Sequence, residues 1–409
     1  MQRLSEFFSL RLAVVGAGPV GLSLALHAAR ALPQASVTLF DARPLDKDVS
    51  GDPRTLALSL GSVQLLQRLG AWRPESAQAI LEVHVSQQAP SVPPLLGDWL
   101  GEPELRIRAV DEAVPLLGAV MSYGNIVAPL QQEWLGAEQA DPKRLFSRFG
   151  APVAALKRVE AGVEIDAGIA ERFDLAVVAE GGVFGEALQR AAAARSPLRH
   201  DYRQTAWVGQ VGFGAGAGQR ATGVAFERFT RHGPAALLPL KDGRAALVWC
   251  VPSDDDPVAE LNDAQRVTVL NSLFHRAAGE IVSVTPLKCF PLGLNAERTL
   301  TDGRSVRIGN AAQTLHPVAG QGLNLGLRDA FELVHALQRN PDVDAVLRRL
   351  EWQRGPDRWA MIAATDFLAR SFTWKLPGAG AVRGLGIAAL QALSPVKSAL
   401  ARQMMFGRR

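Results

Sequence analysis

The first residues whose type and spacing indicate a binding site are three glycines in the pattern Gly-x-Gly-x-x-Gly: Gly16, Gly18 and Gly21. In such a motif the first glycine makes a tight turn, the second lets the backbone approach a pyrophosphate, and the third lets a helix pack closely on a strand. Asp41 follows Gly21 by 20 residues, where an acid accepts a hydrogen bond from a ribose hydroxyl. The pattern predicts a site for the ADP part of a dinucleotide; a glycine turn in an ordinary βαβ unit is the alternative.

The elements around these glycines have the order that such a site needs. Residues 12–15 are a short apolar run typical of a buried parallel strand, residues 22–32 are rich in helix formers, and residues 36–40 are predicted to form a second strand. The helix would direct its free N–H groups and the positive end of its dipole at the phosphates. The three glycines and the proline inside the uncharged stretch of residues 12–29 argue against a membrane span.

A second motif, RIGNAAQTLHPVAGQGLNLGLRDA, occupies residues 307–330. We expect a strand to end at Gly309, a loop to cross through Pro317, and a helix to begin near Gly322, with its N-terminus facing something anionic or electron-rich. Both motifs together resemble the FAD-binding hallmarks of aromatic-ring flavoprotein monooxygenases, which have the para-hydroxybenzoate hydroxylase fold. The second motif, DPRTLAL at residues 52–58 and LGAW at residues 69–72 are similar to the ubiquinone-biosynthesis hydroxylase family (UbiH/UbiF type).

The resemblance assigns the cofactor FAD and a set of residues that hold it. It implies ADP-side contacts at Gly16, Gly18, Gly21 and Asp41, a flavin contact near the isoalloxazine end at Arg54, and ribityl and pyrophosphate contacts at Gly309 and Asn310. The residues that would line the isoalloxazine ring are Pro317, Gly320, Gln321, Gly322 and Asn324.

Two of the residues in these motifs have a second interpretation. Arg54 could be a surface cation paired with Asp52, and His316 is expected to fix the loop before Pro317 without transferring a proton. The seven histidines lack the spacing of metal ligands, so no metal is expected.

The activity that the resemblance implies is hydroxylation of the aromatic ring of a polyprenyl phenol in ubiquinone biosynthesis. NAD(P)H would reduce FAD, O2 would add to form a flavin hydroperoxide, and the cofactor would carry the chemistry. No catalytic side chain is then required; the pocket loop with His316, Pro317 and Gly320 would lie beside the flavin. The alternatives are a flavin-bound, non-catalytic accessory subunit of a quinone-synthesis complex, or another oxidoreductase of this fold.

One segment departs from the family pattern. Members usually carry Asp-Gly followed by Ser and Arg, a motif tied to FAD and NAD(P)H, whereas this chain has Glu180-Gly181-Gly182 without a clear Ser or Arg counterpart. The electron donor is therefore open. Gln313 stands where many relatives carry His, which is a milder departure.

Length and composition suit an α/β protein of about two packed domains. The chain has 409 residues, 48% of them hydrophobic, and its cysteines, Cys250 and Cys289, form no disulfide framework, which fits a reducing cytoplasm. We expect a Rossmann-like FAD-binding domain with an inserted, mostly antiparallel β-sheet substrate domain and a helical C-terminus. The expected segments are FAD-binding at 1–75, 123–195 and 293–366, substrate-binding at 76–122 and 196–292, and a basic helical tail at 367–409.

The local patterns predict the elements within these segments. Helices are expected at 54–69, 125–135 and 262–278 and from residue 323 onward. The expected strands are 80–86, 105–110, 153–159, 163–165, 173–179, 208–213, 222–229, 235–240, 245–251 and 305–308.

Positive charge gathers at the C-terminus. No Asp or Glu follows Asp366, whereas seven Lys or Arg residues do. Because the formal net charge of the whole chain is +4, the residues up to Asp366 are mildly acidic in sum. This predicts a cytoplasmic, peripherally membrane-associated protein whose tail lies on anionic lipid, with other quinone-biosynthesis proteins as further candidate partners. A solvated tail is the alternative. No nucleic acid is expected, because the basic residues form no recognisable module.

Overall fold

The computed structural model describes residues 10–88, 102–179, 197–214, 222–274, 276–371 and 379–407. A six-stranded sheet forms the nucleotide-binding half, in the order β19-β20-β12-β1-β2-β8. All its pairs are parallel except β19 with β20. Its strands are β1 (Arg11–Val15), β2 (Ser36–Asp41), β8 (Leu145–Phe149), β12 (Leu175–Val178), β19 (Thr301–Asp302) and β20 (Ser305–Arg307).

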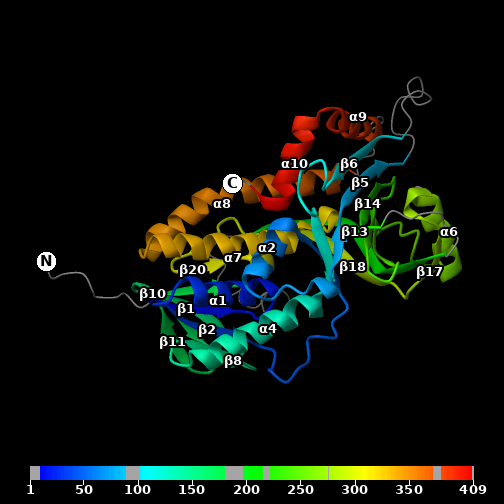
Figure 1. The fold of residues 1–409 in the computed structure, drawn as a ribbon. Helices are drawn as coiled ribbons and strands as arrows, with labels where there is room; N and C mark the ends of the chain where they lie inside the picture. Colours follow the sequence, from blue (N-terminus) through cyan, green and yellow to red (C-terminus); the bar gives the residue numbers. More distant parts are fainter. Residues whose placement is uncertain are drawn as a thin grey trace, which may run out of the picture.

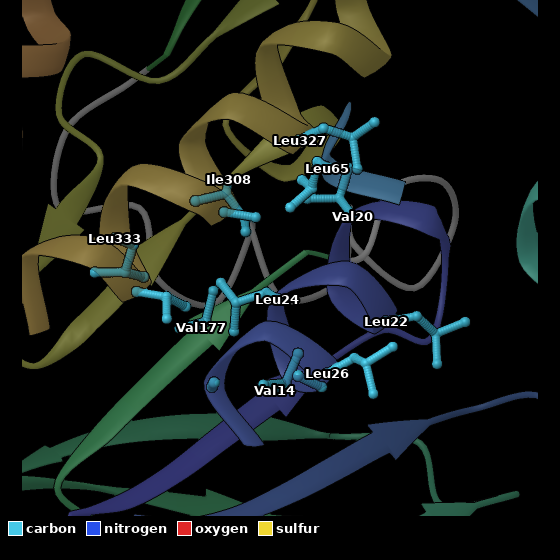
Figure 2. Close-up of a cluster of buried hydrophobic side chains, with 14 of the residues drawn as sticks. Val14, Val20, Leu22, Leu24, Leu26, Leu65, Val177, Ile308, Leu327 and Leu333 are labelled. Atoms are coloured by element: carbon cyan, nitrogen blue, oxygen red, sulfur yellow. The ribbon is translucent and has the colours of Figure 1, made fainter. Parts of the chain in front are cut away.

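Each face of this sheet is covered. On one face, α1 (Pro19–Ala31) packs against α7 (Gln321–Arg339) and α4 (Tyr123–Ala140). Figure 2 shows the buried apolar side chains that join α1, α7 and the strands, among them Leu24, Val177 and Leu333. The other face packs on a three-stranded antiparallel sheet of β9 (Ala155–Val159), β10 (Gly162–Asp166) and β11 (Ala170–Phe173).

A second large sheet forms the other half of the molecule. Its order is β21-β18-β13-β16-β15-β14-β5-β6, with β17 beside β13. Every pair is antiparallel except β14 with β5. Its strands are β5 (Glu82–Gln87), β6 (Glu104–Arg108), β13 (Leu198–Phe213), β14 (Val224–Phe229), β15 (Pro234–Pro239), β16 (Ala245–Pro252), β17 (Ile281–Val284), β18 (Lys288–Ala296) and β21 (Gln313–Thr314). One face packs on α6 (Asp263–Leu273), and the expected mostly antiparallel sheet is confirmed.

The C-terminal helices fold back over the molecule. After α8 (Val343–Ser371), α9 (Ala379–Ala392) lies against β6, and α10 (Ser394–Phe406) lies against α2 and β3. Figure 1 shows α9 and α10, in red, beside β5 and β6. The expected helical C-terminus is therefore confirmed, and it packs on the body of the protein.

The predicted helix over residues 54–69 is wrong in its first third. Residues 55–59 form the strand β3 (Thr55–Ser59), and only then does α2 (Leu60–Arg68) begin. β3 pairs along its whole length with β7 (Gly118–Ser122), which also pairs with β4 (Gln78–Ile80). Ser59 then begins the helix, because its hydroxyl accepts a hydrogen bond from the Ser62 N–H.

Candidate functional site

The first glycine loop lies at the carboxyl end of β1. Gly16 has φ +103°, which favours glycine, and its N–H donates to Phe40 O at 2.7 Å. A Cβ on Gly21 would lie 1.8 Å from Gly16 O, so only glycine lets α1 approach the loop this closely. A Cβ on Gly18 would meet only the Tyr123 hydroxyl, at 3.6 Å. Gly18 is the N-cap of α1 and has no side chain to occupy the first N–H groups of the helix.

Asp41 faces the same loop from the end of β2. Its Oδ2 accepts a hydrogen bond from the Ala17 N–H, and its Oδ1 accepts one from the Arg43 N–H at 2.7 Å. The structure therefore brings Asp41 and the three glycines together, as the spacing predicted. Each carboxylate oxygen keeps a lone pair that could accept a further hydrogen bond, such as one from a ribose hydroxyl.

Gly309 and Asn310 follow β20 at the same edge. Because β1, β12 and β20 are parallel, the residues after their last positions share one side of the sheet. Gly309 has φ +59°, and a Cβ on Gly326 of α7 would lie 2.7 Å from its Cα. Close packing of the loop on α7 thus needs both glycines, while Asn310 is exposed at the edge.

The loop before α7 offers a second uncapped helix N-terminus. Gly320 has φ +58° and is the N-cap of α7, without a side-chain cap. A Cβ on Gly322 would meet nothing within 4 Å, so there is open space beside the first turn. Pro317, Gly320 and Gln321 line the cavity described below.

Asn324 also borders that cavity, but its side-chain oxygen and nitrogen make all their hydrogen bonds within the protein. Its Oδ1 accepts from the Ser59 N–H and the Ser62 hydroxyl, both at 2.7 Å. Its Nδ2 donates to Ala57 O at 2.9 Å and to Gly320 O at 3.0 Å. Asn324 therefore holds β3 and α2 against the loop and leaves no amide group for a ligand.

His316 is buried and ties the same loop down. Its Nδ1 accepts from the Val318 N–H at 3.2 Å, so the proton is on Nε2, which lies 3.1 Å from Gln204 Oε1. Burial lowers the pKa of His316 to about 4, so the imidazole is neutral at physiological pH. These contacts fit the interpretation of a residue that fixes the loop.

Arg54 makes a bidentate ion pair with Asp52, with its Nη2 2.8 Å from Asp52 Oδ2. Its guanidinium also stacks on the Tyr123 ring, 4.1 Å from the centroid. A Cβ on Gly18 would lie 3.6 Å from the Tyr123 hydroxyl, so Arg54 lies near the glycine loop. Its contact with the flavin stays a prediction.

A cavity of about 1090 Å³ lies between the large sheet and the C-terminal helices. Its walls are mostly apolar. They come from β3, β5, β6, β14, β15 and β16, from the loop with Pro317 and Val318, and from α8, α9 and α10. Apart from Pro317, Gly320, Gln321 and Asn324, the sequence did not identify these wall residues. The alternation Ala225, Glu227, Phe229 in β14 was the one local signal, because it places a carboxylate among apolar side chains on one face of a strand.

The two departures from the family pattern, at Glu180-Gly181-Gly182 and at Gln313, have different outcomes. Glu180-Gly181-Gly182 lies outside the described residues. Gln313 is buried, and its Oε1 accepts from Arg358 Nε at 2.6 Å, so it serves the packing of α8.

The comparisons with known proteins agree with this geometry. A family model described as "FAD binding domain" matches residues 199–352. The structure of Klebsiella pneumoniae HpxO complexed with FAD and uric acid superposes with a TM-score of 0.71 at 16% identity, over 97% of both chains. The fold is thus that of FAD-dependent aromatic monooxygenases.

Two relatives match nearly the whole chain. Ubiquinone hydroxylase UbiL of Rhodospirillum rubrum is 29% identical, over 96% of this chain and 88% of its own. The 3-demethoxyubiquinol 3-hydroxylase of Escherichia coli (strain K12) is 29% identical, over 94% of this chain and 96% of its own. Over nearly its whole length the chain is therefore similar to ubiquinone-biosynthesis hydroxylases.

The residues present fit FAD. The helices α1 and α7 both begin without a side-chain cap, and the Asp41 carboxylate lies beside the first glycine loop, where the spacing predicted a ribose contact. Glycines occupy the positions where the cofactor must approach the backbone. Gly18 and Gly322 leave open space, and Gly21 and Gly326 permit the close packing that positions both loops.

Proposed function

We propose that this protein hydroxylates the aromatic ring of a polyprenyl phenol in ubiquinone biosynthesis, with FAD, O2 and electrons from NAD(P)H. The observation that carries the proposal is the apolar cavity, which is bordered by the loop at Pro317, Gly320 and Gln321, where the flavin ring would lie. At about 1090 Å³ it exceeds the roughly 300–1,000 Å³ of ordinary ligand pockets. It therefore has room for a ring together with part of an isoprenoid chain. The names of the two full-length relatives support the same substrate class.

The residues of the chain would bind and orient the reactants. Bound FAD supplies the activation of O2 and the transfer of one oxygen atom. Gly16, Gly18 and Gly21 would receive the pyrophosphate and Asp41 the ribose, while the first N–H groups of α7 would face the ring. The apolar walls exclude water from the reacting ring, and they bind the chain by the hydrophobic effect.

We propose contact with a membrane surface through the turn between α9 and α10. Among the described residues, no helix is long and apolar enough to cross a bilayer. Leu385, Leu393 and Val396 are each about half exposed, and Leu390 and Leu400 of the same helices line the cavity. Some of the basic charge is already engaged, because Arg370 pairs with Asp366 at 2.8 Å and Arg402 with Glu112 at 3.8 Å. The apolar turn would therefore contribute more to lipid contact than the basic residues.

The segment boundaries expected from the sequence remain part of the proposal. The strands of residues 76–122 and 196–292 would bind substrate, and the three FAD-binding segments would hold the cofactor. NAD(P)H, the altered segment at Glu180, and contacts with other quinone-biosynthesis proteins are likewise proposed from the resemblance.

Quinone intermediates in a deletion strain test the proposal. A strain that lacks this protein should accumulate a prenylated phenol one hydroxyl short of the next intermediate, and the wild-type gene should restore flux. The Gly18→Asp variant should fail to restore it, because a carboxylate would face the pyrophosphate. If Gly18→Asp restored the flux, the hypothesis of a non-catalytic accessory subunit would be favoured, because FAD chemistry would then be dispensable.

A further inference from the structure

Glu227 is a carboxylic acid in the floor of an apolar cavity. The strand registers place it in a row with Val85 of β5, Ala236 of β15 and Val248 of β16. All four residues line the cavity, as do Ala225 and Phe229, the neighbours of Glu227 on the same face of β14. Apolar side chains thus flank this carboxyl along its strand and across the sheet.

The protein gives this carboxyl no partner among the residues that the structure describes. No hydrogen bond or ion pair of Glu227 exists there, whereas the adjacent Arg228, on the opposite face, pairs with Glu102 at 2.6 Å. Among the described residues, the ionisable groups on the same side are Cys250 of β16 and Arg383 of α9. Burial, and to a lesser extent the charge of Glu227, raise the pKa of Cys250. Arg383 donates a hydrogen bond to Ser371 O of α8.

Burial raises the pKa of Glu227 to about 8. A buried carboxyl without a partner destabilises a fold, and an apolar residue at this position would continue the wall. The position therefore suits a polar group that enters with a ligand. Below a pH of about 8 the carboxyl is protonated and can donate, whereas the carboxylate that forms above it can only accept hydrogen bonds. The ligand group that matches the ionised form is a donor such as a hydroxyl.

We propose that Glu227 accepts a hydrogen bond from the phenolic hydroxyl of the substrate and takes up its proton, which makes Glu227 a catalytic residue of the reaction. This inference rests on the proposed function for the identity of the phenol.

The step balances without a redox partner. The phenol O–H bond breaks, its electron pair stays on the phenolate oxygen, and an O–H bond forms on the carboxyl. The negative charge moves from Glu227 to the substrate, so the net charge of the cavity is unchanged. The phenolate ring is richer in electrons, which favours attack by an electrophilic oxygen.

Binding tests the proposal without turnover. Affinities of FAD-loaded protein are compared at pH 9, where Glu227 is ionised, for a short-chain prenylphenol and its methyl ether, which lacks the donor. The wild type should prefer the phenol by at least about 10-fold, equal to about 1.4 kcal/mol. Glu227→Leu should lose this preference and bind the ether as well as before. A wild type that binds both equally, or a Glu227→Leu protein that keeps the preference, would overturn the assignment.

The pH dependence of hydroxylation supplies the second readout. The single-turnover rate of the wild type should rise as the pH passes about 8, where Glu227 ionises. Glu227→Gln should lose that rise and be slower by about 100-fold, with FAD content and the flavin reduction rate unchanged. Glu227→Asp should keep the rise, and Glu260→Gln, on the surface, should match the wild type.

The outcomes separate the two proposals. A wild type that binds phenol selectively but forms no product would contradict the proposed hydroxylation and leave Glu227 as the phenol acceptor. A wild type that forms product, with a Glu227→Gln rate equal to it at every pH, would overturn the role of Glu227 and leave the hydroxylation standing.

Discussion

His316 Nε2 donates a hydrogen bond to Gln204 Oε1 across 3.1 Å, and this buried contact joins the loop before α7 to the long strand β13. Gln204 Nε2 in turn donates to Ala369 O of α8 at 3.2 Å. One neutral amide therefore connects the proposed flavin loop, the large sheet and the C-terminal helices. A substitution that displaces any one of these three parts should therefore also displace the other two.

Replacing His316 should loosen the loop and weaken FAD binding. We expect His316→Ala to lower the free energy of unfolding by about 2 kcal/mol, because Gln204 and the Val318 N–H lose a buried partner. Unfolding curves and FAD titration check this, with the partly exposed His232→Ala as control. Unchanged affinity and stability would contradict the positioning role.

The lowered pKa of His316 predicts that the loss of stability in His316→Ala depends on pH. The folded pKa of His316, about 4, lies below the ordinary 6.5, so the unfolded chain takes up a proton first as the pH falls. The stability contributed by neutral His316 is therefore present above pH 6.5 and is lost progressively toward pH 4. The Tm difference between wild type and His316→Ala should be larger at pH 7.5 than at pH 5.

Substitutions in the glycine loop should have two different effects, loss of FAD binding at Gly18 and loss of stability at Gly21. Gly18→Asp should fold, since its Cβ has room, but it should bind no FAD, because its carboxylate would oppose the pyrophosphate. Gly21→Ala should destabilise the protein itself, because the new Cβ would lie 1.8 Å from Gly16 O. Tm and the flavin absorbance per protein separate the two effects. Gly18→Ala should keep the wild-type Tm, and a yellow, fully loaded Gly18→Asp protein would refute the pyrophosphate site.

Glu227 should lower stability as the pH rises. Its folded pKa of about 8 lies above the ordinary 4.5, so between these values the folded protein holds a proton that the unfolded chain releases. The stability relative to an uncharged side chain is fully present below pH 4.5 and declines until about pH 8. Glu227→Gln should therefore gain Tm over the wild type, and the gain should grow from pH 5 to pH 8. A gain that is constant with pH would contradict the burial of a free carboxyl.

The turn between α9 and α10 should determine lipid contact. Leu393→Glu combined with Val396→Glu should reduce pelleting with anionic liposomes several-fold, because two exposed apolar side chains would be replaced by charges that the lipid repels. Trp352→Glu is the matched control, since Trp352 is 84% exposed on α8. Equal pelleting of the double variant and the wild type would assign lipid contact elsewhere.

Local spacing predicted the parts of the site that are close in sequence. Gly16, Gly18 and Gly21 act within a single turn, and Asp41 follows on the adjacent strand, so a βαβ pattern was sufficient to place them. The floor of the cavity could not be predicted in this way. Glu227 lies beside Val85 only because β14 pairs in parallel with β5, and that register depends on the whole sheet.

The error at residues 54–69 has a related cause. Residues 55–59 contain helix formers, yet they pair with β7, which lies about 60 residues further along the chain. The tertiary pairing overrides the local preference. The sequence predicted that the tail is a basic helix on anionic lipid. That its apolar residues line the cavity depends on how α9 and α10 fold back on the body, which no local pattern indicates.

Oxygen labelling tests the central claim most directly. FAD-loaded protein, NAD(P)H and a short-chain prenylphenol would be incubated under ¹⁸O2, and the product examined by mass spectrometry. We predict a phenol that carries one additional hydroxyl with one ¹⁸O atom, formed by the wild type and absent with Gly18→Asp. Flavin reoxidation that yields only hydrogen peroxide, with no ¹⁸O in any of a series of ring-substituted prenylphenols, would contradict the account.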